Sequence, residues 1–314
     1  MERPFDVLVV GELNVDLILD HLVAAPAVGK ETLARAMTLT LGSSSAIFAS
    51  NLRCLGPRVA FLGKVGTDLF GSFVVERLRV GGVDTNSLLV DPRYATGATV
   101  VLNQGEDRAM VTYPGAMEQL TLADVTPPLL ASARHLHVAS VFLLPGLRPG
   151  LAGLLRRARE AGMTTSLNPQ WDPAEAWDLD LATLLPEVDV FLPNEAELLR
   201  LTRRSDVPSA LAALRPFARA VVVKQGSRGA TLQARGEVLS RPAFLNPRVV
   251  DAIGAGDSFD AGFVSRFIQG DTLERCLDRG NLMGAVSTTA AGGTGAFTSL
   301  ASVMAIAKER FSHA

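Results

Sequence analysis

The segment DAIGAGDSFDAGF, residues 251–263, brings one aspartate directly behind a glycine-rich stretch and before an apolar helical pattern. The pattern predicts that Gly254, Ala255 and Gly256 form the first turn of a helix, where backbone amides are free. Free amides and the helix dipole favour a bound phosphate. Asp257 could then take a proton from a hydroxyl group that attacks this phosphate. An ordinary helix start with an acidic first turn fits the same residues.

A second candidate site lies in FLPNEAELLRLT, where a buried strand is predicted to end at Asn194 and a helix to follow. Asn194 and Glu197 are three residues apart and share one helical face at the carboxyl end of a strand, where open α/β sheets bind ligands. A carboxylate there could hold Mg²⁺ directly or through water. A capping box, with Asn as N-cap and Glu at the third position, explains the two residues equally well.

Other catalytic motifs are missing from the chain. It contains no GxxxxGK[ST] and no GxGxxG between a strand and a helix, which disfavours P-loop and dinucleotide-binding proteins. GxSxG and HExxH are also absent, and no histidines have helical metal-ligand spacing. His135 and His137 share one face of a predicted strand, so we interpret them as structural.

The elements that would carry these residues alternate between short strands and helices. Runs rich in Val and Ile predict strands at 7–11, 59–63, 135–141, 188–194 and 220–226. Helical periodicity predicts helices at 45–56, 68–82, 147–162 and 194–202. Such alternation favours an α/β fold with a doubly wound, mostly parallel sheet flanked by helices. Residues 95–115 and 230–244 instead predict hairpins. We expect one domain over 1–314.

Composition restricts the partners. The net charge of -2 gives no general attraction to nucleic acid or an anionic membrane, so a small-molecule substrate is expected. No apolar run reaches about 18 residues and no cleavable signal is seen, which predicts a cytoplasmic protein. Cys54 and Cys276 lie far apart and indicate neither a disulfide framework nor a zinc site.

Taken together, the motifs resemble the ribokinase-like (PfkB) carbohydrate kinase family over nearly the whole chain. The matching segments run in order through GELNVDLI, LGSSSAIFASNLRCLG, KVGTDLFG, NEAE, VVVKQGSRGA and DAIGAGDSFDAGF. The resemblance implies a ribokinase-like fold with a small β lid, formed by roughly residues 12–40 and 95–115. It also implies an ATP-dependent kinase of a sugar or sugar-like substrate, and lid strands that can pair two subunits into a homodimer.

The resemblance assigns roles to individual residues. Asp257 would be the general base, and the backbone of Gly254, Ala255 and Gly256 would form the anion hole for the transferred group. Mg²⁺ and its water shell would be organised on ATP by Asn194 and Glu197. The remaining contacts to the nucleotide would come from Lys224, Gly226, Ser227, Gly229 and, near adenine, Asn281. Asp251 matches the place where many members hold a monovalent cation such as K⁺.

Substrate hydroxyls would be held by Asn14 and Asp16, which share one face of a strand-like stretch, and by Gly42 and Ser43. A turn cap is the alternative reading of Asn14 and Asp16.

Three residues of the substrate pocket depart from the family pattern, namely Ile47, Met117 and Gln170. Apolar groups cannot hydrogen-bond a sugar hydroxyl, so the substrate is expected to differ from ribose. Ile47 and Met117 could face a nucleobase, which makes a nucleoside kinase the alternative within this class. A catalytically weak ligand-binding protein on a kinase scaffold is the alternative outside it.

Overall fold

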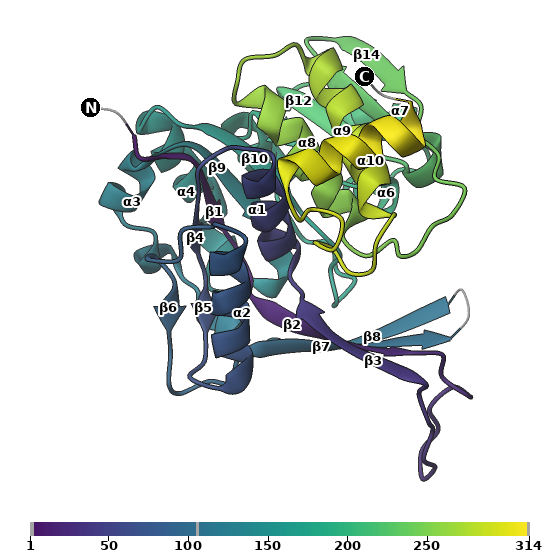
Figure 1. The fold of residues 1–314 in the computed structure, drawn as a ribbon. Coiled ribbons are helices and arrows are strands. Elements are labelled where there is room, and N and C mark those ends of the chain that lie inside the picture. Colours follow the sequence, from purple (N-terminus) through teal and green to yellow (C-terminus); the bar gives the residue numbers. More distant parts are fainter. Residues whose placement is uncertain (1–2, 105–106, 313–314) are drawn as a thin grey trace.

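A computed structural model gives the fold of the chain and describes residues 3–104 and 107–312. Its main body is an eight-stranded sheet with the order β14-β13-β12-β11-β10-β9-β1-β4 (Figure 1). The strands are β1 (Phe5–Val10), β4 (Val59–Leu62), β9 (Ala133–Ala139), β10 (Thr164–Asn168), β11 (Val190–Phe191), β12 (Ala220–Lys224), β13 (Ala230–Ala234) and β14 (Glu237–Arg241). Strands β4 to β12 of this order pair in parallel and β13 and β14 antiparallel, which confirms the predicted doubly wound, mostly parallel sheet.

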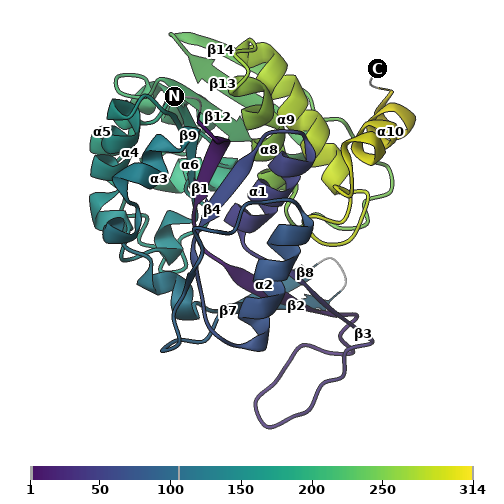
Figure 2. The ribbon, with the colours of Figure 1, turned by 60° about the vertical axis from the view of Figure 1, so that its left-hand side comes forward.

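Helices cover both faces of this sheet (Figures 1 and 2). They are α1 (Ser44–Cys54), α2 (Leu69–Val80), α3 (Pro127–Ala131), α4 (Leu151–Glu160), α5 (Leu181–Leu184), α6 (Glu195–Thr202), α7 (Val207–Leu214), α8 (Ala255–Phe267), α9 (Leu273–Ser287) and α10 (Leu300–Phe311). Side chains alternate along each strand. Leu8 and Val10 therefore pack with α3 to α7, whereas Val7 and Val9 pack with α1, α2, α8 and α9.

A second sheet of four strands projects from the main body (Figure 1). Its order is β3-β2-β7-β8, built from β2 (Asn14–Asp20), β3 (Ala36–Leu41), β7 (Gly97–Gln104) and β8 (Asp107–Tyr113). We call these four strands the small sheet. A short pair, β5 (Lys64–Val65) with β6 (Leu89–Val90), lies near its base. Both predicted hairpins are present, as β7 with β8 and as β13 with β14.

Two predicted elements differ in extent from the sequence expectation. β11 holds only Val190–Phe191, because Pro193 has no amide to donate and Asn194 is already the N-cap of α6. α4 starts at Leu151 rather than near 147, since Pro149 and Gly150 place a 3₁₀ turn before it.

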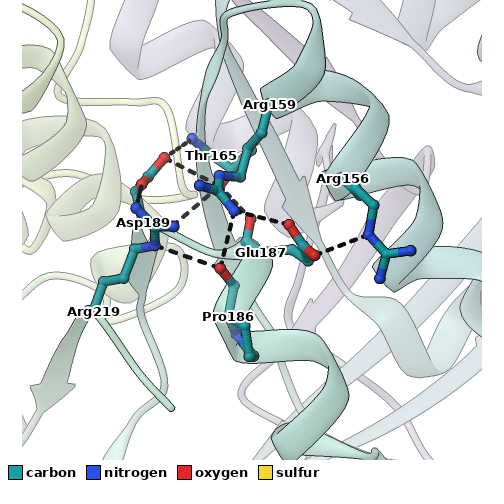
Figure 3. Close-up of polar contacts among 7 residues, drawn as sticks. All are labelled: Arg156, Arg159, Thr165, Pro186, Glu187, Asp189 and Arg219. Atoms are coloured by element: carbon teal, nitrogen blue, oxygen red, sulfur yellow. Dashed lines mark hydrogen bonds and ion pairs between the residues drawn. The ribbon is translucent and has the colours of Figure 1, made fainter.

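A group of polar side chains connects α4 with the segments before β11 and β12, at the amino end of the large sheet (Figure 3). Glu187 accepts hydrogen bonds from Arg156 and Arg159, at 3.0 and 2.9 Å. Asp189 accepts from the Thr165 amide at 2.8 Å and pairs with Arg219 at 3.5 Å.

No helix of the described residues is long and apolar enough to cross a membrane.

His135 and His137 are structural, as predicted. Both are fully buried and bond Ser166, at 2.7 and 2.8 Å, while Phe48 stacks on His137. Burial lowers the pKa of His135 to about 3 and that of His137 well below its usual range. Neither ring therefore carries charge near neutral pH.

Candidate active site

One cavity of about 710 Å³ lies where the carboxyl ends of the large sheet meet the start of α8. Gln170, Asn194 and Lys224 reach it from β10, β11 and β12 or the loops that follow them. Met110 of the small sheet lines the same cavity. In an open parallel sheet, a crevice forms outside the carboxyl ends of the strands, at the point where the strand order reverses. The position of the cavity is the one that this rule gives.

The start of α8 differs slightly from the sequence prediction, which put Gly254 in the first helical turn. Gly254 is the N-cap, with φ 72°, and α8 begins at Ala255. A side chain at Gly254 would also come within 2.6 Å of Gly293 Cα, so only glycine fits here. The Ala255 amide is partly used, because it donates to Ala252 O at 3.3 Å. Among the described residues, the Gly256 amide has no protein acceptor and stays available for an anion.

Asp257 lies in the first turn of α8, lines the cavity and is 7% exposed. Its Oδ1 accepts hydrogen bonds from Ser44 Oγ at 2.6 Å and Gln170 Nε2 at 2.9 Å. No described residue donates to Oδ2. Burial raises the pKa of Asp257 to about 7, with the Ser44 bond and the charge of Lys224 acting in the opposite direction. The carboxyl can therefore take up and release a proton near neutral pH.

Sequence reasoning missed Ser44 as a partner of Asp257 and treated Gln170 only as a departure from the family pattern. Ser44 begins α1 behind Ser43, whose Oγ caps the helix by accepting from the Ala46 amide at 2.9 Å. Gln170 has φ 60°, a left-handed conformation that glycine usually adopts. Neither contact follows from local sequence, because Ser44 lies 213 positions from Asp257.

The residues predicted to bind substrate hydroxyls form two layers. Asp16 lines the cavity, whereas Asn14 lies behind it and donates to Asp16 Oδ1 and Thr99 Oγ1, each at 3.0 Å. A side chain at Gly42 would overlap the Asp16 carboxyl. Ser43 lines the cavity but donates to Glu12 O at 2.7 Å. Of these four residues, Asp16 is thus the one whose carboxyl group the cavity presents to a substrate. Burial raises the pKa of Asp16 to about 6.

The two apolar departures lie in different places. Ile47 lines the cavity and packs against Gly254 and Gly293. Met117, in contrast, is fully buried and is not part of the cavity wall. The prediction that Met117 could face a nucleobase is therefore wrong. Its 3₁₀ turn, Gly115–Gln119, directs the side chain into the protein core instead.

Asn194 and Glu197 form a capping box and also line the cavity. Asn194 Oδ1 accepts from the Glu197 amide at 2.9 Å, and Glu197 accepts from the Asn194 amide at 2.8 Å and from Nδ2 at 2.6 Å. Burial raises the pKa of Glu197. The capping-box interpretation of this pair is therefore correct, and both carboxylate oxygens of Glu197 accept hydrogen bonds from Asn194.

The residues predicted to bind the nucleotide all line the same cavity: Lys224, Gly226, Ser227, Gly229 and Asn281. Gly226 and Gly229 adopt φ 59° and 97°, which shapes the tight turn after β12. Asn281 Nδ2 donates weakly to Arg241 O, at 3.4 Å. The same cavity is also lined by apolar residues, including Phe244, Val249 and Ala285, which suits a flat apolar ring.

Asp251 lies just before α8 and connects its own loop with the loop around Gly292 through hydrogen bonds. Its carboxyl oxygens accept from the Ile253 amide and the Gly292 amide, each at 2.9 Å. Within the part of the chain that the structure describes, no group of three or more His, Cys, Asp or Glu could hold a metal ion.

Comparison with solved structures first defines the class of fold. The chain superposes on Arabidopsis thaliana ribokinase complexed with ribose and ATP with a TM-score of 0.83, at 24% identity over 97% of this chain and 99% of that chain. The fold is therefore ribokinase-like, as the sequence predicted.

The chain belongs to the pfkB family of carbohydrate kinases, whose model matches residues 5–299. Among curated relatives, it is 30% identical over 268 residues to the 2-dehydro-3-deoxygluconokinase of Bacillus subtilis (strain 168), covering 77% of this chain and 80% of that protein. It is 28% identical over 313 residues to an ATP-dependent ribose-1-phosphate kinase of Halopiger xanaduensis, covering 97% and 99%. The predicted class, a carbohydrate kinase, is confirmed.

Proposed function

We propose that the protein transfers the terminal phosphoryl group of ATP to a hydroxyl group of a small sugar or sugar-like molecule. One observation carries the proposal: Asp257 lines the cavity next to Gly256, and the described residues give no partner to Asp257 Oδ2 or to the Gly256 amide. Asp16, the turn at 226–229 and Asn281 line this cavity as well. Asp16 would contact the acceptor, and the turn and Asn281 would contact the nucleotide.

The reaction needs little covalent chemistry from the protein. Asp257 Oδ2 takes the proton of the acceptor hydroxyl while its oxygen bonds to the terminal phosphorus. The bond between that phosphorus and the bridging oxygen breaks, and ADP leaves. The Gly256 amide and the positive end of α8 stabilise the charge on the transferred group. Because two bonds hold Asp257 Oδ1, the carboxyl cannot rotate away from the acceptor.

Mg²⁺ would enter this site with ATP, and Glu197, which lines the cavity, would help to hold it through its water shell. When bound, it neutralises phosphate charge. K⁺ would lie near Asp251, where backbone carbonyls of the two joined loops would have to hold it, since amides occupy the carboxyl. Comparing activity in K⁺ and Na⁺ tests that assignment.

The small sheet would act as a lid and as the contact between two subunits. Asp16 and Met110 line the cavity, and Thr99, which pairs with Asp16, lies on the same face of the small sheet. The opposite face is apolar, since Leu17 pairs with Leu39 and Val100, and Val100 pairs with Val111. A second copy of the chain, in the cytoplasm, would cover this face.

A panel of acceptors tests the function. Purified protein with Mg-ATP should release ADP above the acceptor-free rate with at least one of the sugars, sugar acids, sugar phosphates and nucleosides supplied. Preference for nucleosides would select the alternative kinase. ATP binding without acceptor-dependent turnover would instead support the weak ligand-binding protein.

A further inference from the structure

A second aspartate on α8, Asp260, lies one helical turn beyond Asp257 and is fully buried. It does not line the cavity. Its Oδ2 accepts hydrogen bonds from Lys224 Nζ at 2.9 Å and Asn168 Nδ2 at 2.6 Å. Asp260 therefore acts on the site through Lys224, whose side chain is 10% exposed and does line the cavity.

Lys224 brings its ammonium group to the start of α8. A Cβ placed on Gly256 would lie 3.7 Å from Lys224 Nζ. The ammonium thus stands beside the free Gly256 amide, at the place where the charge of a transferred phosphoryl group would develop. A positive charge fixed there before the reaction starts stabilises such charge without reorganisation.

Asn168 extends these contacts to the base. Its Oδ1 accepts from the Gln170 amide at 3.2 Å, and Gln170 Nε2 donates to Asp257 Oδ1 at 2.9 Å. One unbroken set of hydrogen bonds therefore runs from Asp257 through Gln170, Asn168 and Asp260 to Lys224. The relative position of base and cation is set by protein groups alone.

Stability alone gives a weak reason for burying this ion pair. Removing charged groups from water costs roughly several kcal/mol per ion. A protein with two apolar side chains of similar size at these positions is often as stable as one with the buried ion pair. The pairing has a chemical benefit, however. A lysine free to move would pair with Asp257 and occupy the oxygen that must take the proton, whereas Asp260 keeps the ammonium on the phosphate side.

We propose that Lys224 is a catalytic residue that stabilises the transferring phosphoryl group, and that Asp260 is the positioning residue that holds Lys224 there and away from Asp257. The proposal deepens the nucleotide contact inferred for Lys224 and rests on the proposed kinase function.

Three variants test it: Lys224→Met, Asp260→Asn and the two combined. The double variant removes both charges and so leaves no unpaired buried charge, which would destabilise Lys224→Met alone. We expect kcat of the double variant to fall about 100-fold, as when a preorganised transition-state donor is lost, while its Tm stays near that of the parent. Arg219→Met with Asp189→Asn removes a more exposed ion pair, at the amino end of the sheet, and should leave kcat unchanged (Figure 3).

The dependence of kcat on pH in the two single variants supplies a second measurement. A pair that only stabilises the fold would not shift the acid limb in opposite directions in the two variants. Lys224 lowers the pKa of Asp257, whereas Asp260 and Glu12 raise it. The acid limb of kcat should therefore move to higher pH in Lys224→Met and to lower pH in Asp260→Asn. A double variant with parental kcat, or acid limbs that coincide with the parental one, would show that the pair is only structural.

Binding of nucleotides separates this proposal from the function itself. Calorimetry with AMP-PNP and with AMP needs no acceptor. In the double variant, Kd for AMP-PNP should rise about tenfold, equivalent to about 1.4 kcal/mol, and Kd for AMP should stay the same. If the parent turned over no acceptor but showed this difference, the kinase assignment would fail and the phosphate contact of Lys224 would stand. Equal effects on both nucleotides would overturn the contact.

Discussion

Ser44 gives the sharpest test of how the protein tunes its base. The change Ser44→Ala removes the 2.6 Å bond to Asp257 Oδ1 and leaves the bond from Gln170 in place. That Ser44 bond lowers the pKa of Asp257, which burial has raised to about 7. Its loss should therefore raise the pKa of the base further.

The size of the effect follows from the geometry. A hydrogen bond to a charged group contributes about 1.5–3 kcal/mol, and about 1.4 kcal/mol corresponds to a tenfold change in a proton equilibrium. The acid limb of kcat should move upward by about one pH unit. At pH 7 the ionised fraction of the base would fall from about one half to about one tenth, so kcat falls about fivefold.

The assay is kcat against pH from 5.5 to 9.5 with saturating acceptor and Mg-ATP. Activity of Ser44→Ala should return to the parental value near pH 9, because the base is then ionised in both proteins. Ser240→Ala, in the exposed β14 strand, serves as a matched control and should leave the profile unchanged. Superimposable profiles for Ser44→Ala and the parent would refute the role given to this bond.

Three further predictions concern stability and assembly. Gly254→Ala should lower the free energy of unfolding in urea by at least about 1–2 kcal/mol, because φ is 72° and Gly293 leaves no room for a methyl group; an unchanged midpoint would contradict this. Burial raises the pKa of Asp257 to about 7 and that of Asp260 to about 6. The folded state therefore binds protons more readily than the unfolded chain, and Tm should rise as the pH is lowered from 8 to 5.5. This rise should be smaller in the double variant Asp257→Asn with Asp260→Asn. Val111→Lys should dissociate a dimer in sedimentation analysis, whereas Val238→Lys, exposed on β14, should not.

Local sequence was sufficient for most of the fold. Val-rich runs and glycine-stopped helices predicted the strand and helix alternation, and both hairpins appeared where polar turns interrupt apolar segments. These signals succeed because they depend on neighbours in the chain. The extent of β11 was less predictable, since its end is set by Pro193 and by the cap of α6 together.

The site shows where sequence reasoning reaches its limit. The first turn of α8 could be predicted because glycines followed by an apolar pattern already imply free amides. The partners of Asp257 could not, because Ser44 and Gln170 meet it only through the topology of the sheet. Met117 was misplaced for the same reason: its neighbours in sequence do not reveal that its turn faces the core.

The most direct test of the central claim compares the parent with Asp257→Asn on the best acceptor of the panel. Phosphorus NMR would follow the phosphorylated product, and calorimetry would measure ATP affinity. We predict that product formation falls by at least about 1,000-fold while Kd for ATP changes less than about threefold, since a general base acts on the acceptor and not on the bound nucleotide. Product formation at the parental rate by Asp257→Asn would contradict the assignment of Asp257 as the base.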